Sequence, residues 1–394
     1  MFSLNYKGRI HKSKLSMRGI RYVLSDQAAR AFPSLQRRWL FPVESRPIAE
    51  AASRDLALPS AAIGVPVPGP LAELKVPLAE PLQSVLHIYR LEDAIVTGWA
   101  GAMIKDGELM AITKMPNWAS HLRARTHTLR DLPPGRPYFN LMCPIPARGH
   151  IFHWLFESVV PVLAFLKNGG AGPGLGLLVN ARRSGIQQST IDYLKARHGI
   201  DAVEALGAGD AARVPELHAA VAVPYDPLAL KPAAGIEMLS DFGEFIAGGL
   251  PESGFPKRIY ISRNDARLRR VSNEDRLMEA ILEKRGFTRV TLGGMPMARQ
   301  VQHFRQAEAI VSPHGAGLAH LAWCRPGTKA IEFFPGLGGP RGRVRNATAN
   351  MWLIAQQRGL DYRCYFAGAP ETRDDAFTIP EELMRQALDE ARIG

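Results

Sequence analysis

Short apolar runs alternate with helical segments through the second half of the chain, and this alternation limits the folds available to it. The expected strands are 258–262, 289–292, 309–312 and 329–334, and the expected helices between them include 272–285 and 297–306. The first of these helices carries Leu277, Ile281 and Leu282 on one side. Strands that alternate with helices predict a parallel, doubly wound α/β sheet. Ligands of such a sheet bind outside the carboxyl ends of its strands.

The strand expected at 309–312 runs into a turn that is suited to an anion. The turn reads Ser312-Pro313-His314-Gly315-Ala316-Gly317, and a helix is expected to start at Leu318. Backbone N–H groups at a helix start have no partner within the helix, and the peptide dipoles favour negative charge there. The candidate contacts of a phosphate-bearing ligand are therefore Ser312, His314, Gly315, Ala316 and Gly317.

Four arginines follow the end of the strand expected at 258–262: Arg263, Arg267, Arg269 and Arg270. The planar guanidinium fits phosphate oxygens and keeps its charge at any relevant pH. Two of the four could therefore clamp a diphosphate against the 312–317 turn. Arg263 lies closest to the strand end and is the first candidate, whereas Arg267 and Arg269 are expected to lie in a solvated loop.

One carboxylate, Glu332, stands in the otherwise apolar run 329–334. A buried carboxylate must find polar partners or stay near water. A pair of ribose hydroxyls and a structural salt bridge are equally consistent with the sequence.

A second constellation lies on a helix expected at 153–167. His153 and Glu157 are four residues apart, which places them on one face of that helix. A histidine beside a carboxylate is a candidate general base, because its pKa is easily placed near neutrality. The alternative is an ordinary polar edge on a core helix. His150 precedes the helix and has less support.

The length of 394 residues predicts two domains. We expect an N-terminal domain at 1–230, with a basic and poorly patterned lead-in at 1–75, and a C-terminal domain at 231–394 that ends in a helix. In the first half, β-type runs at 84–89, 93–99 and 109–112 predict a small sheet, and the Ala-rich segment 49–57 predicts a helix.

The distribution of charge and the composition limit the classes of binding partner to be expected. Residues 1–50 carry ten Lys or Arg and three acids. We expect a solvated basic face there, with peripheral contact to an anionic membrane as the alternative. No nucleic-acid motif and no apolar run long enough to span a membrane occur, and the N-terminus does not resemble a secretory signal, so a cytoplasmic protein is expected. The three cysteines are too few and too far apart for a disulfide framework or a zinc site.

Several blocks in order resemble glycosyltransferase family 61, which includes capsular-polysaccharide-type enzymes. The blocks are Phe152-His153-Trp154-Leu155-Phe156-Glu157-Ser158, Ile259-Tyr260-Ile261-Ser262-Arg263, Arg270-Val271-Ser272-Asn273-Glu274, Pro313-His314-Gly315-Ala316-Gly317-Leu318 and Ile331-Glu332. They cover roughly residues 149–365. One position departs from the family pattern, because His320 stands where the family usually has Asn.

The resemblance implies a GT-B-like fold, with two Rossmann-like doubly wound domains facing a cleft. The domain at 1–230 would lie on the acceptor side, and the domain at 231–394 would bind the nucleotide sugar. It implies inverting, metal-independent transfer of a sugar from a nucleotide-sugar donor to a saccharide acceptor, in capsular or cell-envelope polysaccharide synthesis. No cofactor is expected, because the nucleotide sugar is a substrate. His153 is the expected catalytic base, with Glu157 orienting it or serving as the base instead. The expected donor-binding residues are Arg263, Arg270, Asn273, Ser312, His314, Gly315, Ala316, Gly317 and Glu332.

Two hypotheses other than a glycosyltransferase remain open from the sequence. The same arginines could belong to a non-catalytic protein that binds a nucleotide or polyanion, or the basic N-terminus could belong to a surface-associated scaffold.

Overall fold

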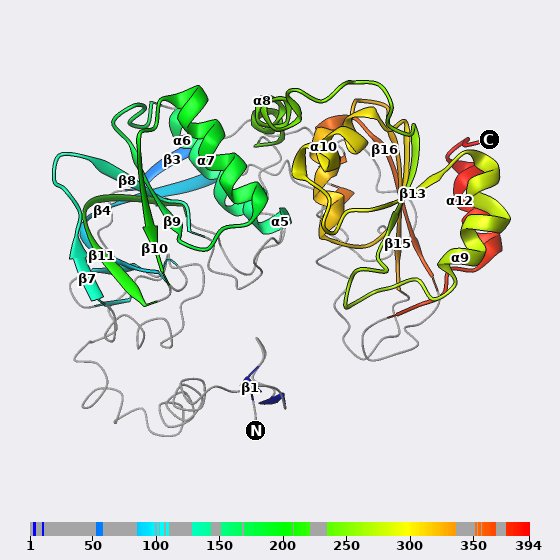
Figure 1. Cartoon of the computed structure of the whole chain (residues 1–394), viewed down its shortest axis with the longest axis horizontal. Helices are drawn as coiled ribbons and strands as arrows, with labels where there is room; N and C mark the ends of the chain where they lie inside the picture. The colour runs from blue at the N-terminus through cyan, green and yellow to red at the C-terminus, as the bar shows by residue number, and fades with distance from the viewer. Residues whose placement is uncertain are drawn as a thin grey trace.

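A computed structural model of the chain contains two larger sheets with helices beside them (Figure 1). It describes residues 3–4, 10–11, 53–57, 85–98, 101, 103–105, 108–109, 128–142, 151–167, 169–207, 209–220, 235–335, 351–352, 354–355, 357–367 and 376–394. The short strands β1 (Ser3–Leu4) and β2 (Ile10–His11) pair with each other. The rest of 1–50, and the proline-containing segment 224–232 at the boundary of the two expected domains, lie outside the described residues. No helix in these described ranges combines the length and apolar character that a membrane span requires.

The first sheet is mixed, with strand order β10-β9-β8-β11-β4-β5-β6, while β3 pairs with β4 and β7 with β11. Its strands are β3 (Ser53–Ala57), β4 (Val85–Thr97), β5 (Met103–Lys105), β6 (Glu108–Leu109), β7 (Thr128–Asp131), β8 (Pro137–Asn140), β9 (Gly176–Asn180), β10 (Ala202–Leu206) and β11 (Asp210–Ala220). The strands β10, β9, β8 and β11 run parallel, as alternation with helices predicts, whereas β4 pairs antiparallel with β11, β3 and β5. This sheet is therefore only partly of the parallel, doubly wound type expected.

Two local expectations for the first half are wrong. The segment 49–57 was expected to be helical, but Ser53–Ala57 is a strand that pairs with β4, because tertiary pairing outweighs the helix propensity of alanine. The runs at 84–89 and 93–99 form one strand, β4, rather than two. The interruption that separates them in the sequence is local: Asp93 has a φ of 49° and lies across from Pro215, which has no N–H to donate to the ladder.

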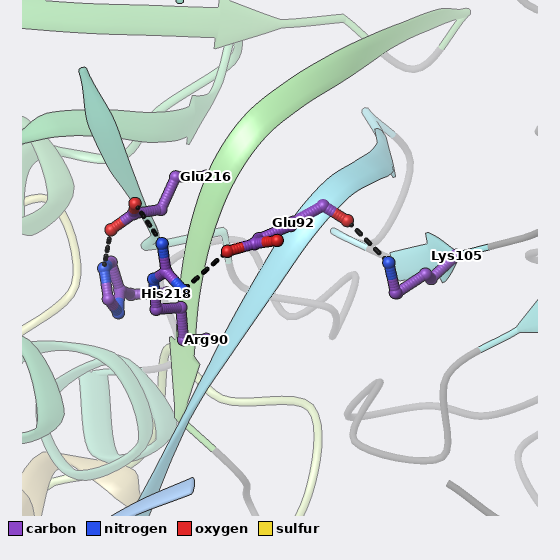
Figure 2. Close-up of polar contacts among 5 residues, drawn as sticks. All are labelled: Arg90, Glu92, Lys105, Glu216 and His218. Atoms are coloured by element: carbon purple, nitrogen blue, oxygen red, sulfur yellow. Dashed lines mark hydrogen bonds and ion pairs between the residues drawn. The ribbon is translucent and has the colours of Figure 1, made fainter. Parts of the chain in front are cut away.

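Charged side chains cross the antiparallel part of this sheet (Figure 2). Arg90 on β4 donates to Glu92 at 2.7 Å and to Glu216 on β11 at 2.8 Å, and His218 lies 2.9 Å from Glu216. Lys105 on β5 donates to the carbonyl of Glu92 at 2.9 Å. These residues share one face because alternate positions of a strand point to the same side. The cluster joins three strands, and within it Arg90 forms ion pairs with both Glu92 and Glu216.

The second sheet is wholly parallel, with strand order β13-β12-β14-β15-β16. Its strands are β12 (Arg258–Ser262), β13 (Thr288–Thr291), β14 (Ala309–Pro313), β15 (Lys329–Phe334) and β16 (Asp361–Phe366). This confirms the parallel sheet predicted for the second half. After β12 the chain places β13 on one side and β14 on the other, so the order reverses between β12 and β14. Such a switch point is where ligands bind in open α/β sheets.

Helices lie beside both sheets, and α8 lies between them (Figure 1). The helical segments are α5 (Ile151–Trp154), η2 (Leu155–Val159), α6 (Val160–Lys167), α7 (Gly185–His198), α8 (Gly235–Ala247), α9 (Glu274–Leu277), η3 (Met278–Leu282), η4 (Glu283–Arg285), α10 (Met297–Gln306), η5 (Ala316–Trp323) and α12 (Glu381–Glu390). The expected final helix is confirmed as α12.

Both faces of the second sheet are apolar, and each face belongs to a different cluster. Ile259 and Ile261 of β12 face α8, α10 and η5, whereas Tyr260 faces the side of α9 and α12. The first of these clusters extends without a break to Phe139 and Phe156 of the other half. The two halves therefore share one hydrophobic core.

Candidate functional site

A cavity of about 160 Å³ opens at the carboxyl ends of β12 and β14, where the strand order reverses. Its lining includes Ser262, Arg263, Asp265, Ser312, Gly315 and Gly317. The structure thus brings together the strand end with its arginine and the 312–317 turn, which are about fifty residues apart in the sequence. We call this cavity the switch-point pocket.

The guanidinium of Arg263 lies directly against Gly315. A Cβ at Gly315 would lie 2.8 Å from Cζ of Arg263, well inside van der Waals contact. Gly315 has a φ of −175°, which any residue can adopt, so the close approach and not the backbone conformation calls for glycine. Arg263 Nη2 donates to the carbonyl of Leu268 at 2.9 Å. Burial, with the nearby charge of Arg269, lowers the pKa of Arg263 to about 10.

A buried carboxylate fixes the strand end that carries Arg263. Glu274, at the start of α9, is 2% exposed and accepts hydrogen bonds from Ser262 at 2.7 Å and Asn264 at 2.9 Å. The hydroxyl of Tyr260 donates to its other oxygen at 3.3 Å. Since a buried carboxylate is stable only with such partners, this network sets the direction in which the chain leaves β12.

His314, Glu332 and Tyr362 form a buried hydrogen-bonded series beside the pocket. His314 Nδ1 lies 2.5 Å from Glu332 Oε1, and the hydroxyl of Tyr362 donates to Glu332 Oε2 at 2.5 Å. The imidazole of His314 also stacks on Phe334, with ring centroids 4.5 Å apart. Burial lowers the pKa of His314, Glu332 opposes this shift, and Arg269 and Arg263 add to it. Both carboxylate oxygens of Glu332 are bound to protein groups. This favours a structural role for Glu332 over binding to ribose hydroxyls, the two alternatives that the sequence left open.

His153 and Glu157 are in contact, as their spacing predicts. His153 Nδ1 lies 2.5 Å from Glu157 Oε1, and the two side chains are 30% and 11% exposed. The turn between them is not regular: α5 passes into the π-helix η2, and the N–H of Val160 donates to the carbonyl of Leu155. Pro161 follows and has no N–H for a regular α-helical bond, which favours the wider turn. Single π turns of this kind occur frequently at functional sites.

Helix α5 links this dyad to the switch-point pocket. Trp154 anchors α5 to α7 through a 2.9 Å hydrogen bond from Nε1 to the hydroxyl of Thr190. On its other side α5 packs against η5, the helix that starts next to Gly315. The helix that carries His153 and the helix that follows the 312–317 turn are thus in mutual contact.

Two expected donor-binding residues of the second block, Arg270 and Asn273, are not among the residues that line the switch-point pocket. Asn273 uses both ends of its amide on the backbone of Ile379, at 2.8 and 3.1 Å. Arg270 is exposed, and its carbonyl accepts from the N–H of Phe377. Arg269, which was expected to be solvated, is half-buried, and its charge acts on both Arg263 and His314.

Tyr362 is a site residue that the sequence analysis did not find. It lies on β16, whose pairing with β15 places it beside Ala330, and no strand was expected at 361–366. The apolar alternation of that segment, Tyr362-Arg363-Cys364-Tyr365-Phe366, is the signal that could have revealed the strand.

His320, the departure from the family pattern, is fully buried on η5. Its Nδ1 lies 2.8 Å from the carbonyl of Gly317, and its ring stacks on Phe304 with centroids 4.9 Å apart. Burial lowers the pKa of His320 to about 4. The neutral ring thus ties the last residue of the turn to the helix that follows it.

Residues 151–331 match the family model described as Glycosyltransferase 61. The matched segment begins at α5 and ends within β15, so it contains His153, Arg263 and His314. A search of curated proteins gives no match to the chain.

Proposed function

Because this chain belongs to glycosyltransferase family 61 by its residues 151–331, we propose that it transfers a sugar from a nucleotide-sugar donor to a saccharide acceptor, with inversion at the anomeric carbon. Glycosyl transfer is the activity of the family. The choice of donor, the stereochemistry and the acceptor are our proposals, and they rest on the two constellations at α5 and at the switch-point pocket.

The observation that carries the proposal is the guanidinium of Arg263 against Gly315 at the switch-point pocket. A diphosphate carries negative charge that grows as it leaves the sugar. Arg263 and the backbone N–H groups at the start of η5 are suited to offset that charge. His314, held by Glu332, lies beside them as a further contact of the leaving group. Ser312, Ala316 and Gly317 complete this side of the proposed donor site, and Arg270 and Asn273 remain proposed contacts through the family pattern only.

The dyad on α5 supplies the base in this proposal. An acceptor hydroxyl oxygen attacks the anomeric carbon and forms the new C–O bond. The bond between that carbon and the donor phosphate oxygen breaks, and its electron pair leaves with the nucleoside diphosphate. His153 takes the acceptor proton on Nε2 while Glu157 holds Nδ1 and stabilises the imidazolium. Transfer in this form uses cationic side chains on the leaving group, needs no cofactor and is proposed to be independent of metal.

We extend the proposal to a cytoplasmic enzyme of capsular or cell-envelope polysaccharide synthesis. The support is the family alone. The proposed peripheral membrane contact involves residues 1–50, almost all of which lie outside the described residues.

The test is release of nucleotide from a panel of UDP- and GDP-sugars, with a CMP-sugar as the arm that lacks a diphosphate. We expect slow hydrolysis of at least one diphosphate donor and none of the CMP-sugar. Turnover of the CMP-sugar alone, or of no donor in the presence or absence of saccharide acceptors, would contradict the proposed donor class.

The base is tested separately with His153→Ala and Glu157→Gln, and with Lys167→Ala, an exposed residue at the end of α6, as the matched control. We expect loss of transfer in the first two with donor binding retained. Near-normal turnover in both would refute the assignment of the base.

A further inference from the structure

A second cavity, of about 120 Å³, lies among α8, the end of α10 and the end of η5. Its lining residues are Ser240, Glu244, Arg305, Trp323, Arg325 and Arg358. None of these six residues lines the switch-point pocket. Because half of them are arginines, we call this cavity the arginine pocket.

The parallel second sheet brings the three arginines together. Arg305 lies a few residues before β14 begins, and Arg325 and Arg358 lie a few residues before β15 and β16. These three strands are neighbours and run in the same direction, so their amino ends meet at one end of the sheet. The switch-point pocket lies at the carboxyl ends of β12 and β14. The two pockets are therefore at opposite ends of the sheet.

Arg358 holds one wall of the arginine pocket in place. Its Nε and Nη2 donate to the carbonyl of Cys324 at 3.1 and 2.6 Å, and its Nη1 donates to the hydroxyl of Ser240 on α8 at 3.2 Å. Cys324 ends η5, so two of these bonds satisfy a carbonyl at a helix C-terminus. Next to it, Nε1 of Trp323 donates to the carbonyl of Leu239 on α8 at 3.1 Å. Arg358 thus joins η5 to α8, which gives it a structural role.

Arg305 and Arg325 have weaker partners among the described residues. Arg305 lies 3.9 Å from Glu244, whose side chain is 62% exposed. Arg325 is exposed and donates to the amide oxygen of Gln306 at 3.4 Å, a long bond to a neutral group. Contacts of this kind between exposed side chains contribute little to stability. Two guanidiniums thus meet one exposed carboxylate at this cavity, and the fold itself gains little from placing both of them here.

Guanidiniums that border one cavity from three different connections suit a phosphate group. Arginine keeps its charge at any relevant pH, and its planar fork pairs with two oxygens of a phosphate or carboxylate. One such fork is enough for the two oxygens of a carboxylate. A phosphate monoester has three terminal oxygens around one centre, so it can accept from guanidiniums that approach from different sides. The cavity volume exceeds the roughly 30 Å³ that one water occupies in the liquid, so it has room for a phosphate group.

We propose that the arginine pocket binds the phosphate group of a ligand through Arg305 and Arg325, beside the fixed guanidinium of Arg358. The shared chemistry is a phosphate monoester, whether it is free phosphate, part of a phosphorylated saccharide or the headgroup of a lipid. Binding replaces the weak contacts of Arg305 and Arg325 by charge-assisted hydrogen bonds. The site is separate from the proposed donor site, so this inference does not rest on the proposed function.

The test is calorimetric titration of the full chain with inorganic phosphate at constant ionic strength. Arg325→Ala is the first variant, because it removes only one long hydrogen bond from the described structure. Its affinity for phosphate should fall at least about tenfold, as for loss of hydrogen bonds to a charged group. Arg305→Ala should weaken binding as well. Arg325→Lys keeps the charge without the planar fork and should lose part of the affinity.

Two controls assign the binding to this pocket. Arg385→Ala removes an exposed arginine of α12, which packs on the other face of the second sheet, and should bind phosphate as the wild type does. Arg263→Ala removes the guanidinium at the switch-point pocket, where phosphate could also bind. The loss caused by Arg325→Ala should be the same in this background, because the two sites are independent.

Three probes identify the source of the phosphate group: inorganic phosphate, glucose 6-phosphate, and vesicles of phosphatidylcholine with and without phosphatidic acid. Binding of a soluble probe that depends on Arg325 supports a free phosphate or a phosphorylated saccharide. Binding confined to the vesicles with phosphatidic acid, and dependent on Arg325, supports a lipid headgroup.

The inference is overturned if the wild type binds none of the three probes, or if Arg325→Ala and Arg305→Ala both bind within twofold of it. Unfolding of Arg325→Ala, seen as a lost thermal transition without phosphate, would assign the residue to the fold and would also overturn it. The proposed function stands under each of these results, because nucleotide release at the other end of the sheet tests it separately.

Discussion

Gly315→Ala should weaken ligand binding at the proposed donor site while leaving the stability of the fold almost unchanged. A Cβ at this position would lie 2.8 Å from Cζ of Arg263 and closer still to Nη1, so the guanidinium must move. Because Gly315 has extended backbone geometry, alanine adds no backbone strain. The three nearest atoms among the described residues all belong to Arg263, the side chain proposed to bind the diphosphate.

The size of the effect follows from the contacts that Arg263 would lose. In the free protein, displacement of the guanidinium would weaken or break its hydrogen bond to the carbonyl of Leu268. Such a bond contributes a net stability of about 0.5–1.5 kcal/mol, and water can partly replace it. In the complex, it removes hydrogen bonds to a charged ligand, which contribute about 1.5–3 kcal/mol. Affinity for a nucleoside diphosphate should therefore fall roughly ten- to hundredfold, with a loss of unfolding free energy of about 1 kcal/mol or less.

A double-mutant cycle with Arg263→Ala makes the test specific. If Gly315→Ala acts by displacing the guanidinium, it should cost almost no affinity once Arg263 is already alanine. Calorimetry of all four proteins with UDP or GDP, and urea unfolding of each, gives the two quantities needed. Equal losses from Gly315→Ala in both backgrounds would refute the reasoning, as would wild-type affinity in the single variant.

Three other predictions concern stability. Burial lowers the pKa of His320 to about 4, whereas the pKa of a histidine in an unfolded chain is about 6.5. Below pH 6.5 the unfolded state therefore binds a proton that the folded state does not. The unfolding free energy should fall by about 3 kcal/mol between pH 6.5 and pH 4. His320→Asn should remove that part of the slope in urea unfolding, and parallel pH profiles would contradict it. Tyr362→Phe removes a donor from buried Glu332 and should cost about 1–3 kcal/mol in the same assay; a loss below about 0.5 kcal/mol would show that the bond is dispensable. Gly243→Ala places a Cβ 2.6 Å from Nε1 of Trp323 on η5 and should lower the unfolding free energy by about 1–3 kcal/mol. In Gly185→Ala the new Cβ meets no atom within 4 Å, so this variant should be as stable as the wild type.

The second half of the fold could be predicted because its signals are local. Strands such as β12 and β14 are short apolar runs bounded by helices with clear apolar stripes, so their parallel direction follows from the alternation, whereas their order in the sheet was not predicted. The antiparallel strand β4 could not be predicted as one element, because its continuity across Asp93 depends on pairing with β11 more than one hundred residues away.

The candidate site was predictable to the extent that spacing and strand ends determine it. His153 with Glu157, and Arg263 with the 312–317 turn, follow from helical periodicity and from the position of strand ends. The partial burial of Arg269 did not follow, because nothing in the sequence of four neighbouring arginines shows which of them is half-buried. Tyr362 lies in the site because β16 pairs with β15, and this long-range pairing was not predicted.

The hydrophobic core common to the two halves has a consequence for how this protein can be divided. Leu239 and Phe242 of α8 belong to the same apolar cluster as Val160 of α6 and Trp323 of η5. A fragment cut before α8 would expose this surface to water, and so would its counterpart. An exchange of C-terminal halves between related chains would therefore have to include the helices α5 to α8 that pack on the exchanged half. The buried contacts, and not the proline-containing segment at 224–232, set the boundary of the unit that can be exchanged.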